Sequence, residues 1–336
     1  PDRDQHRRAM NPFRPPAWLA NRHLQSILPS FPLRRPAVEW RARAVIRSSK
    51  PIVLDCGAGA RLMGWHAEPP AAAAAKSPRM AVLLHGWEGS ADSLYLLSLA
   101  QLLHERGLSV IRLNLRDHGG THALNRELFH SCRLPEVVGA VGRVQALFPG
   151  HRLLLAGYSL GGNFCLRVGA RAPAAGIRLA RIVAVCPVLD PATTLDALEN
   201  GPAVYRNYFL FKWRRSLRLK QAAWPGHYDF GDMIRDSSLT AMTERMVLKH
   251  TEYPDLATYL KGYAITGPML ESLEAPAHLL TSEDDPMIHA RDLAHLARPA
   301  SLEVTVTPRG GHCGYMDALG GPSWIDRWIA DELAAA

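Results

Sequence analysis

The chain has 336 residues, of which 47% are apolar and 21% are charged. These fractions are typical of a globular protein, and 25 prolines with 26 glycines are too few for a disordered or collagen-like chain. Five cysteines without a C-x-x-C pair argue against a disulfide scaffold and against a structural zinc site. The net charge of +8 leaves nucleic acid, anionic lipid and acidic substrates open as partners.

Three features of the sequence bear on the location of the protein. It contains no uninterrupted apolar run of about 18 residues, and residues 1–10 are polar, without the apolar core of a secretory signal. The scattered cysteines fit a reducing compartment. We therefore expect a cytoplasmic protein without a membrane-spanning segment.

From about residue 80, short apolar runs alternate with longer amphipathic segments, a pattern that predicts βα units on a mostly parallel sheet. Strands are predicted over 80–85, 108–113, 152–156, 181–186, 277–281 and 302–307, and helices over 92–106, 135–148, 161–172, 290–297 and 322–333. Ahead of these, 38–46 and 52–65 alternate in polarity and are expected to form antiparallel edge strands, and 69–78 is expected to be a surface connection.

The alternation stops after Pro187 and resumes near Pro276. The intervening stretch is too long for a structureless loop, and its aromatic residues and helical apolar spacing predict a helical insertion. The expected organisation has four parts: an N-terminal segment packing on the core (1–36), the first part of an α/β core (37–189), a helical cap (190–267) and the second part of the core (268–336).

Residues 153–163 place an apolar strand before the pattern G-x-S-x-G and a helix after it. This context is typical of a nucleophile elbow, a tight turn that exposes Ser159 and aims the next amide, that of Leu160, at a developing oxyanion. Gly157 and Gly161 let the strand and the helix approach each other without Cβ clashes. The structural alternative is a glycine-rich turn whose serine only caps the helix.

A serine hydroxyl is a weak nucleophile without a base and an orienting acid. Candidates for both follow in the chain order typical of such sites. Asp284 and Asp285 come directly after the strand predicted at 277–281, and His312 lies in a glycine-rich loop after the last predicted strand. Asp285 is favoured as the acid because it precedes Pro286 and an apolar pair, with Asp284 as the second choice.

The oxyanion needs a second donor, which we expect from the H-G-x-x-G loop at 85–89. We assign it to the Trp87 amide, although an ordinary glycine turn is the alternative. His118 and His122 have a glycine pair between them, so a helix cannot present both rings to a metal. We expect neither a metal nor a cofactor.

The segment 205–220 combines aromatic side chains with a dense basic run. One hypothesis is that this basic aromatic cap makes peripheral contact with a membrane. The other is a cap helix whose aromatic residues pack on the core and whose charges face water. No nucleic-acid recognition motif accompanies the basic run, so no nucleic-acid partner is expected.

Five segments together resemble the YheT-like branch of the α/β-hydrolases, which is related to the eukaryotic ABHD lipases and the plant embryogenesis-associated proteins. They are 21–28, 85–90, 157–163, 284–286 and 310–315. The H-L-Q of the first segment and the G-G-N after the elbow are the more specific of these motifs. The resemblance implies an α/β-hydrolase fold and a triad of Ser159, Asp285 and His312.

The chain departs from its relatives at two places outside the triad. Asp117 stands where relatives usually have glycine in N-x-R-G, and Cys132 stands where they usually have the glycine of H-S-G. We expect these departures to alter local loop shape and substrate choice.

The leading hypothesis is a serine esterase, lipase-like, that cleaves small carboxylic esters with an apolar acyl or alcohol group through an acyl-enzyme. A thioesterase or amidase with the same triad is one alternative. A catalytically silent protein that binds a small ligand in the same fold is the other.

Overall fold

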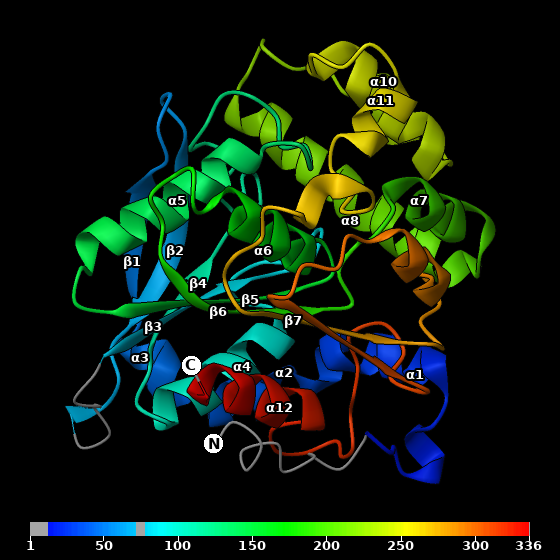
Figure 1. Ribbon diagram of the computed structural model, residues 1–336. Coiled ribbons are helices and arrows are strands. Elements are labelled where there is room, and N and C mark those ends of the chain that lie inside the picture. Colours follow the sequence, from blue (N-terminus) through cyan, green and yellow to red (C-terminus); the bar gives the residue numbers. More distant parts are fainter. Residues whose placement is uncertain (1–12, 72–77, 336) are drawn as a thin grey trace.

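The computed structural model describes residues 13–71 and 78–335, and in this part of the chain eight strands form one sheet in the order β1-β2-β4-β3-β5-β6-β7-β8 (Figure 1). The strands are β1 (Lys50–Asp55), β2 (Arg61–Ala67), β3 (Arg79–Leu84), β4 (Ser109–Leu113), β5 (Arg152–Tyr158), β6 (Leu179–Val185), β7 (Ala277–Ser282) and β8 (Leu302–Thr307). β1 and β2 pair antiparallel at one edge, β2 pairs antiparallel with β4, and the other pairs are parallel. The expected mostly parallel α/β sheet is confirmed.

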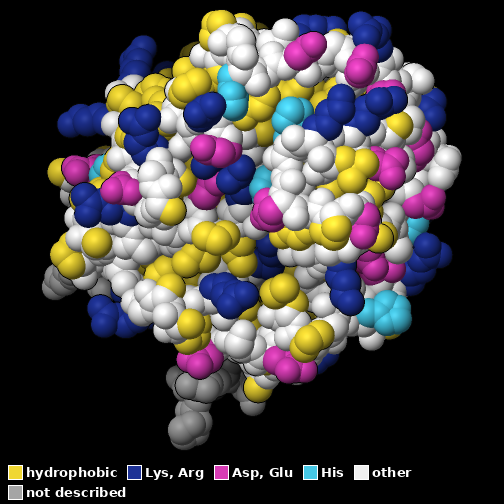
Figure 2. Space-filling view, turned by 90° about the horizontal axis from the view of Figure 1, so that it is seen from above, with side chains coloured by type: hydrophobic (Ala, Val, Ile, Leu, Met, Phe, Trp, Pro, Cys, Tyr) yellow, Lys and Arg dark blue, Asp and Glu magenta, His cyan; other side chains and the backbone are white. Residues whose placement is uncertain are grey.

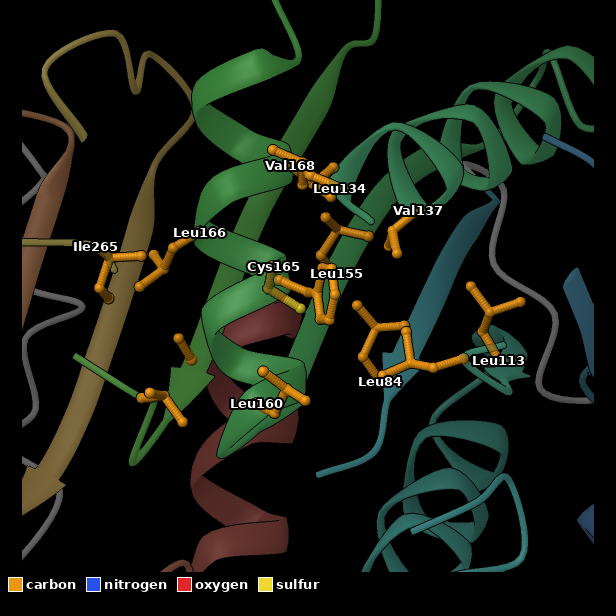
Figure 3. Packing of buried hydrophobic residues seen from close by; sticks show 14 of the residues in the cluster. Leu84, Leu113, Leu134, Val137, Leu155, Leu160, Cys165, Leu166, Val168 and Ile265 are labelled. Atoms are coloured by element: carbon orange, nitrogen blue, oxygen red, sulfur yellow. The ribbon is translucent and has the colours of Figure 1, made fainter. Parts of the chain in front are cut away.

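Helices cover both faces of the sheet (Figure 1). On one face lie α2 (Arg35–Arg41), α3 (Arg43–Ser48), α4 (Leu94–Glu105) and α12 (Trp324–Ala334), and on the other lie α5 (Leu134–Leu147) and α6 (Leu160–Arg171). Alternate residues of β5 enter the two buried layers, with Leu153 and Leu155 on the α6 side and Leu154 and Ala156 on the α4 side. A strand buried on both faces needs such a continuous apolar run. Figure 3 shows Leu155 among the apolar residues of α5 and α6.

The predicted edge strand at 38–46 is wrong, because this stretch forms α2 and α3. Its polarity alternates, but the buried positions are Val38, Ala42 and Val45, spaced as one face of a helix, whereas Trp40 and Ile46 are exposed. The helical N-terminal segment therefore continues to Ser48, beyond the boundary expected at residue 36.

Three smaller differences concern local structure. The run at 52–65 is not one strand, because a turn with positive φ at residues 57–59 divides it into β1 and β2. The helix expected at 290–297 is a 3-10 helix, η6 (Ala290–His295). Most of the surface connection expected at 69–78, and the polar residues at 1–10, lie outside the described residues.

The remaining helices belong to the N-terminal segment and to the insertion between β6 and β7. The N-terminal ones are η1 (Ala17–Leu19), α1 (Arg22–Ile27), η2 (Leu28–Ser30) and η3 (Pro32–Arg34). Between β6 and β7 lie α7 (Pro191–Asn200), α8 (Ala203–Ala223), α9 (Gly231–Arg235), α10 (Leu239–His250) and α11 (Leu256–Lys261), followed by η5 (Pro268–Leu270). We propose that residues 190–267 form a cap over the core. No helix in the described ranges is long and apolar enough to cross a bilayer.

A buried ion pair fastens α8 to the loop after β4. Lys220 is fully buried, and its Nζ donates to Asp117 Oδ1 at 2.8 Å and to the carbonyls of Asn125 and Glu127 at 2.7 and 2.9 Å. The other oxygen of Asp117 accepts the Phe129 amide at 2.8 Å. Asp117, one of the two departures noted in the sequence, thus joins α8 to the loop after β4.

Candidate active site

Ser159 lies on a sharp turn between β5 and α6. Its φ of 54° and ψ of −121° are strained for a residue with a side chain, and its amide donates to Val185 O at 2.8 Å. A Cβ on Gly157 would lie 2.4 Å from Gly161 O, and a Cβ on Gly161 would lie 2.5 Å from Leu84 O. Both glycines are therefore required for the close approach of helix and strand that exposes this serine.

His312 contacts a carboxylate at the end of β7. The distance from its Nδ1 to Asp285 Oδ2 is 2.8 Å, while Asp285 Oδ1 accepts the amides of Met287 and Ile288 at 2.8 and 2.9 Å. Asp284 instead accepts the Gly311 amide at 2.8 Å. Of the two candidate acids, it is Asp285 that meets the histidine.

This contact sets the protonation of His312. Burial lowers the pKa of the imidazole, but the charge of Asp285 and its hydrogen bond outweigh that effect, so the pKa of His312 is raised. With Asp285 accepting at Nδ1, the neutral ring carries its proton there and Nε2 is left as a basic nitrogen. Ser159 and His312 line the same cavities.

The loop that carries His312 is held by the N-terminal helix α1. Buried Gln25 donates to Leu19 O and Met316 O at 2.8 and 2.9 Å and accepts the Met316 amide at 2.7 Å. Ser26 Oγ accepts the His312 amide at 2.9 Å. The H-L-Q segment had marked only a resemblance, and this role of Gln25 was not predicted. The available signal was a polar side chain on the inner face of a short helix.

The loop after β3 lies against the serine. A Cβ on Gly86 would be 3.3 Å from Ser159 Cβ, and the Trp87 amide has no protein acceptor among the described residues. The Leu160 amide opens α6 and so lacks an intrahelical acceptor. Two main-chain donors are thus free near Ser159, at the residues that the sequence analysis assigned.

Two buried histidines support this loop, and the sequence analysis gave neither a role there. His85 Nε2 accepts the Leu115 amide at 3.1 Å, and His118 Nε2 accepts the Glu88 amide at 3.1 Å. Their Nδ1 atoms contact the carbonyls of Gly86 and Arg116, each at 2.7 Å. Because burial lowers the pKa of His85 to about 4 and that of His118 well below its usual value, both rings are neutral supports at pH 7.

Two cavities meet at Ser159 and His312. One, of about 100 Å³, lies under the cap and is lined mainly by apolar residues, among them Leu160, Val188, Leu198, Trp213, Met246 and Ile288. The other, of about 490 Å³, lies between the N-terminal segment and α8, and apolar residues in its lining are joined by the ionisable residues Arg35, Glu88, Asp92 and Lys212. Stacking of Trp87 on Phe209, with ring centroids 5.0 Å apart, places aromatic rings of the loop and of α8 at the walls of both.

Within the described residues, one group could supply three ligand atoms to a metal, namely Cys186, His312 and Cys313, whose ligand atoms lie within 4.8 Å of one another. Nδ1 of the histidine is occupied by Asp285, and burial raises the pKa of the Cys313 thiol well above its usual value, which opposes the thiolate that a metal requires. The donors therefore fit a metal poorly.

A mostly parallel sheet, a strained serine at the end of a central strand and a histidine–aspartate pair at the ends of later strands together define the hydrolase class of α/β proteins. Residues 81–320 match the model of the alpha/beta hydrolase family, and the chain belongs to that family.

Similar proteins that carry a description agree with the family resemblance indicated by the sequence motifs. The chain is 26% identical over 283 residues to "Putative esterase YheT" of Escherichia coli, covering 81% of this chain and 80% of the relative. It is 21% identical over 321 residues to phospholipase ABHD3 of Mus musculus, covering 91% of this chain and 74% of the relative. The YheT-like resemblance is confirmed.

Solved structures support the fold. The esterase Pf2001 of Pyrococcus furiosus superposes with a TM-score of 0.56 at 13% identity, covering 85% of this chain and 92% of the esterase. The 2,6-dihydroxy-pseudo-oxynicotine hydrolase superposes with a TM-score of 0.57 at 17% identity, covering 94% and 78% of the two chains.

Proposed function

We propose that the protein is a serine hydrolase that cleaves carboxylic esters, with Ser159 as nucleophile, His312 as base and Asp285 as the acid that orients it. The observation that carries this proposal is the convergence of the strained serine and the His312–Asp285 pair on one cavity junction. No hydrogen bond joins Ser159 Oγ to His312 in the described part of the chain, and such bonds often tighten only when substrate binds.

The proposed reaction has two halves. His312 Nε2 takes the proton of Ser159 Oγ as the oxygen attacks the carbonyl carbon, and the oxyanion accepts hydrogen bonds from the Trp87 and Leu160 amides. His312 then gives the proton to the departing alcohol. Water attacks the acyl-enzyme with His312 again as base, which releases the acid and restores the serine.

The two cavities support a division of the substrate. An apolar cavity of about 150 Å³ takes up the six carbons of benzene, so the cavity of about 100 Å³ under the cap suits a short acyl group, on the order of four carbons. The larger cavity between α8 and the N-terminal segment suits the alcohol group. We propose a small ester with an apolar acyl chain as the substrate class.

The test uses Ser159→Ala, with Ser272→Ala as the matched control because Ser272 makes one hydrogen bond to Ala170 O outside both cavities. The first variant should lose turnover of p-nitrophenyl butyrate and labelling by a fluorophosphonate, and the control should keep both. Labelling that persists in Ser159→Ala would refute the nucleophile. Turnover of an ester, an acyl-CoA thioester and an amide of one acyl group separates the esterase from a thioesterase or amidase.

A further inference from the structure

The mouth of the larger cavity is bounded by two segments far apart in the sequence. Phe31 and Arg35 of the N-terminal segment line one side, and Val204, Tyr208 and Lys212 of α8 line the other. A 2.8 Å hydrogen bond between His23 Nδ1 and the Tyr205 hydroxyl joins the two sides. They therefore form one continuous rim, which we call the entrance rim.

The rim is apolar on its outside. Val204, Tyr208 and Phe211 are spaced along one face of α8 and all are exposed, Phe211 by 66%. Opposite them, Phe31 and Leu33 are exposed, Leu33 by 82%. Of the 15 large apolar side chains exposed in the described part of the chain, three lie in residues 24–33 beside the larger cavity and four lie on α8. Such gathering marks an interaction surface, whereas scattered exposed residues need no explanation.

The same two segments are strongly basic. α8 contains no Asp or Glu and six Lys and Arg residues, of which Lys220 is buried in its ion pair with Asp117 and the other five lie outside the core. Residues 22–35, the part of the N-terminal segment beside the larger cavity, contain three arginines and no Asp or Glu. Within the ranges that the structure describes, no carboxylate lies within ion-pair distance of Arg215 or Arg218, which follow Phe211 along α8.

The face seen from above in Figure 2 carries Lys and Arg side chains interspersed with Asp and Glu. On α8 and in residues 22–35, basic side chains instead occur without Asp or Glu and lie beside exposed apolar side chains, although Glu88 and Asp92 line the cavity behind them. Basic residues beside exposed aromatic and leucine side chains suit an interface of anionic headgroups over acyl chains.

We propose that the entrance rim docks on anionic lipid surfaces, so that the larger cavity opens toward the bilayer. The surface differs from the cap contact expected from the sequence, because half of it comes from the N-terminal segment and because Tyr205 and Trp213 of the basic aromatic run are buried. Docking does not depend on the proposed hydrolysis, so it holds for a protein without the Ser159 hydroxyl.

Vesicle flotation tests the proposal. The full chain carrying Ser159→Ala, which removes the lipid hydrolysis proposed above, is mixed with vesicles of phosphatidylcholine alone or with 30% phosphatidylglycerol, at low and high salt. We expect binding to the anionic vesicles that weakens with salt. A basic residue at an anionic surface is worth about fivefold in affinity, so Arg215→Glu with Arg218→Glu should weaken binding at least tenfold.

Matched variants locate the surface. Leu33→Ser with Phe211→Ser should also weaken binding about tenfold, whereas Leu248→Ser and Arg291→Glu, exposed residues outside the rim, should leave it unchanged. Equal binding to neutral vesicles, equal loss in the control variants, or no binding to either vesicle would overturn the proposal. Binding of a nucleic-acid oligomer without vesicle binding would overturn it in favour of a polyanion surface. Circular dichroism confirms that each variant is folded.

Discussion

Replacing Lys220 by methionine should strongly destabilise the protein. Methionine keeps most of the side-chain volume but leaves Asp117 as a buried charge, with the Phe129 amide as its one remaining hydrogen-bond donor in residues 13–71 and 78–335. Removing one partner of a buried ion pair costs about 3–5 kcal/mol. The carbonyls of Asn125 and Glu127 lose a donor as well, so we expect a loss of unfolding free energy at the upper end of that range.

The loss should depend on pH. Burial raises the pKa of Asp117 to about 6 even with Lys220 beside it, and removing the lysine raises that pKa further. A carboxyl whose folded pKa lies above its unfolded value destabilises the fold as pH rises through the folded pKa. Lys220→Met should therefore be closer to the wild type at pH 5 than at pH 8.

Urea unfolding followed by tryptophan fluorescence at both pH values measures this effect. Lys212→Met is the control, since Lys212 lies on the same helix but has no ion-pair partner among the described residues. Adding Asp117→Asn should recover much of the loss, because asparagine removes the charge, keeps an acceptor for the Phe129 amide and tolerates the φ of 58°. A loss under 1 kcal/mol, or a double variant as unstable as the single one, would refute the reasoning.

Three further predictions concern the site. Gln25→Ala should lower both activity and stability, and the free energy of unfolding should fall by about 2–4 kcal/mol because three hydrogen bonds to the backbone are lost. The control Gln145→Ala loses two hydrogen bonds to the loop at 176–178 and should lower stability only. Equal activities of the two variants would contradict the positioning role of Gln25. Because the pKa of His312 is raised, kcat/KM should increase with pH through a pKa above the usual value for histidine. Asp285→Asn should lower this pKa and should slow the reaction about 10⁴-fold. A pH profile that this variant leaves unchanged would argue against His312 as the base. Met246→Ala should raise the rate on p-nitrophenyl octanoate relative to butyrate, whereas Met233→Ala, a buried methionine outside both cavities, should leave that ratio unchanged; a shift in both variants would contradict the proposed acyl site.

The fold was predictable because its strands are short, buried and separated by clear turns. The elbow was predictable for the same reason, since Gly157 and Gly161 are required by contacts a few residues away. The secondary structure of the N-terminal segment was not predictable, because the polarity pattern of 38–46 fits a strand and a helix equally well. The structure shows that Trp40 and Ile46 are exposed, which a strand with one buried face would not allow. Only the packing of Val38 and Val45 against the core decides between the two structures.

The candidate site, like the fold, was predictable from the sequence only in part. The chain order of Ser159, Asp285 and His312 indicated that they would meet, and the structure places the aspartate on the histidine. The long-range contacts that hold the site in place could not be predicted from the sequence. Gln25 bonds to Met316 and Lys220 bonds to Asp117, and no local sequence pattern indicates contacts between residues so far apart. The two cavities were hidden too, because each is lined by elements from both the cap and the core.

The hydrogen bonds between Gln25 and the loop of His312 show that the candidate site extends beyond the part of the chain that matches the family. The family model begins at residue 81, whereas Val38, Ala42 and Val45 of the preceding helices already belong to the buried core. A shortened chain that began at β1 would keep Ser159, Asp285 and His312 and still lose the helix against which the histidine loop is set. For this protein, the span that matches the family and the span that the candidate site needs are expected to differ in length.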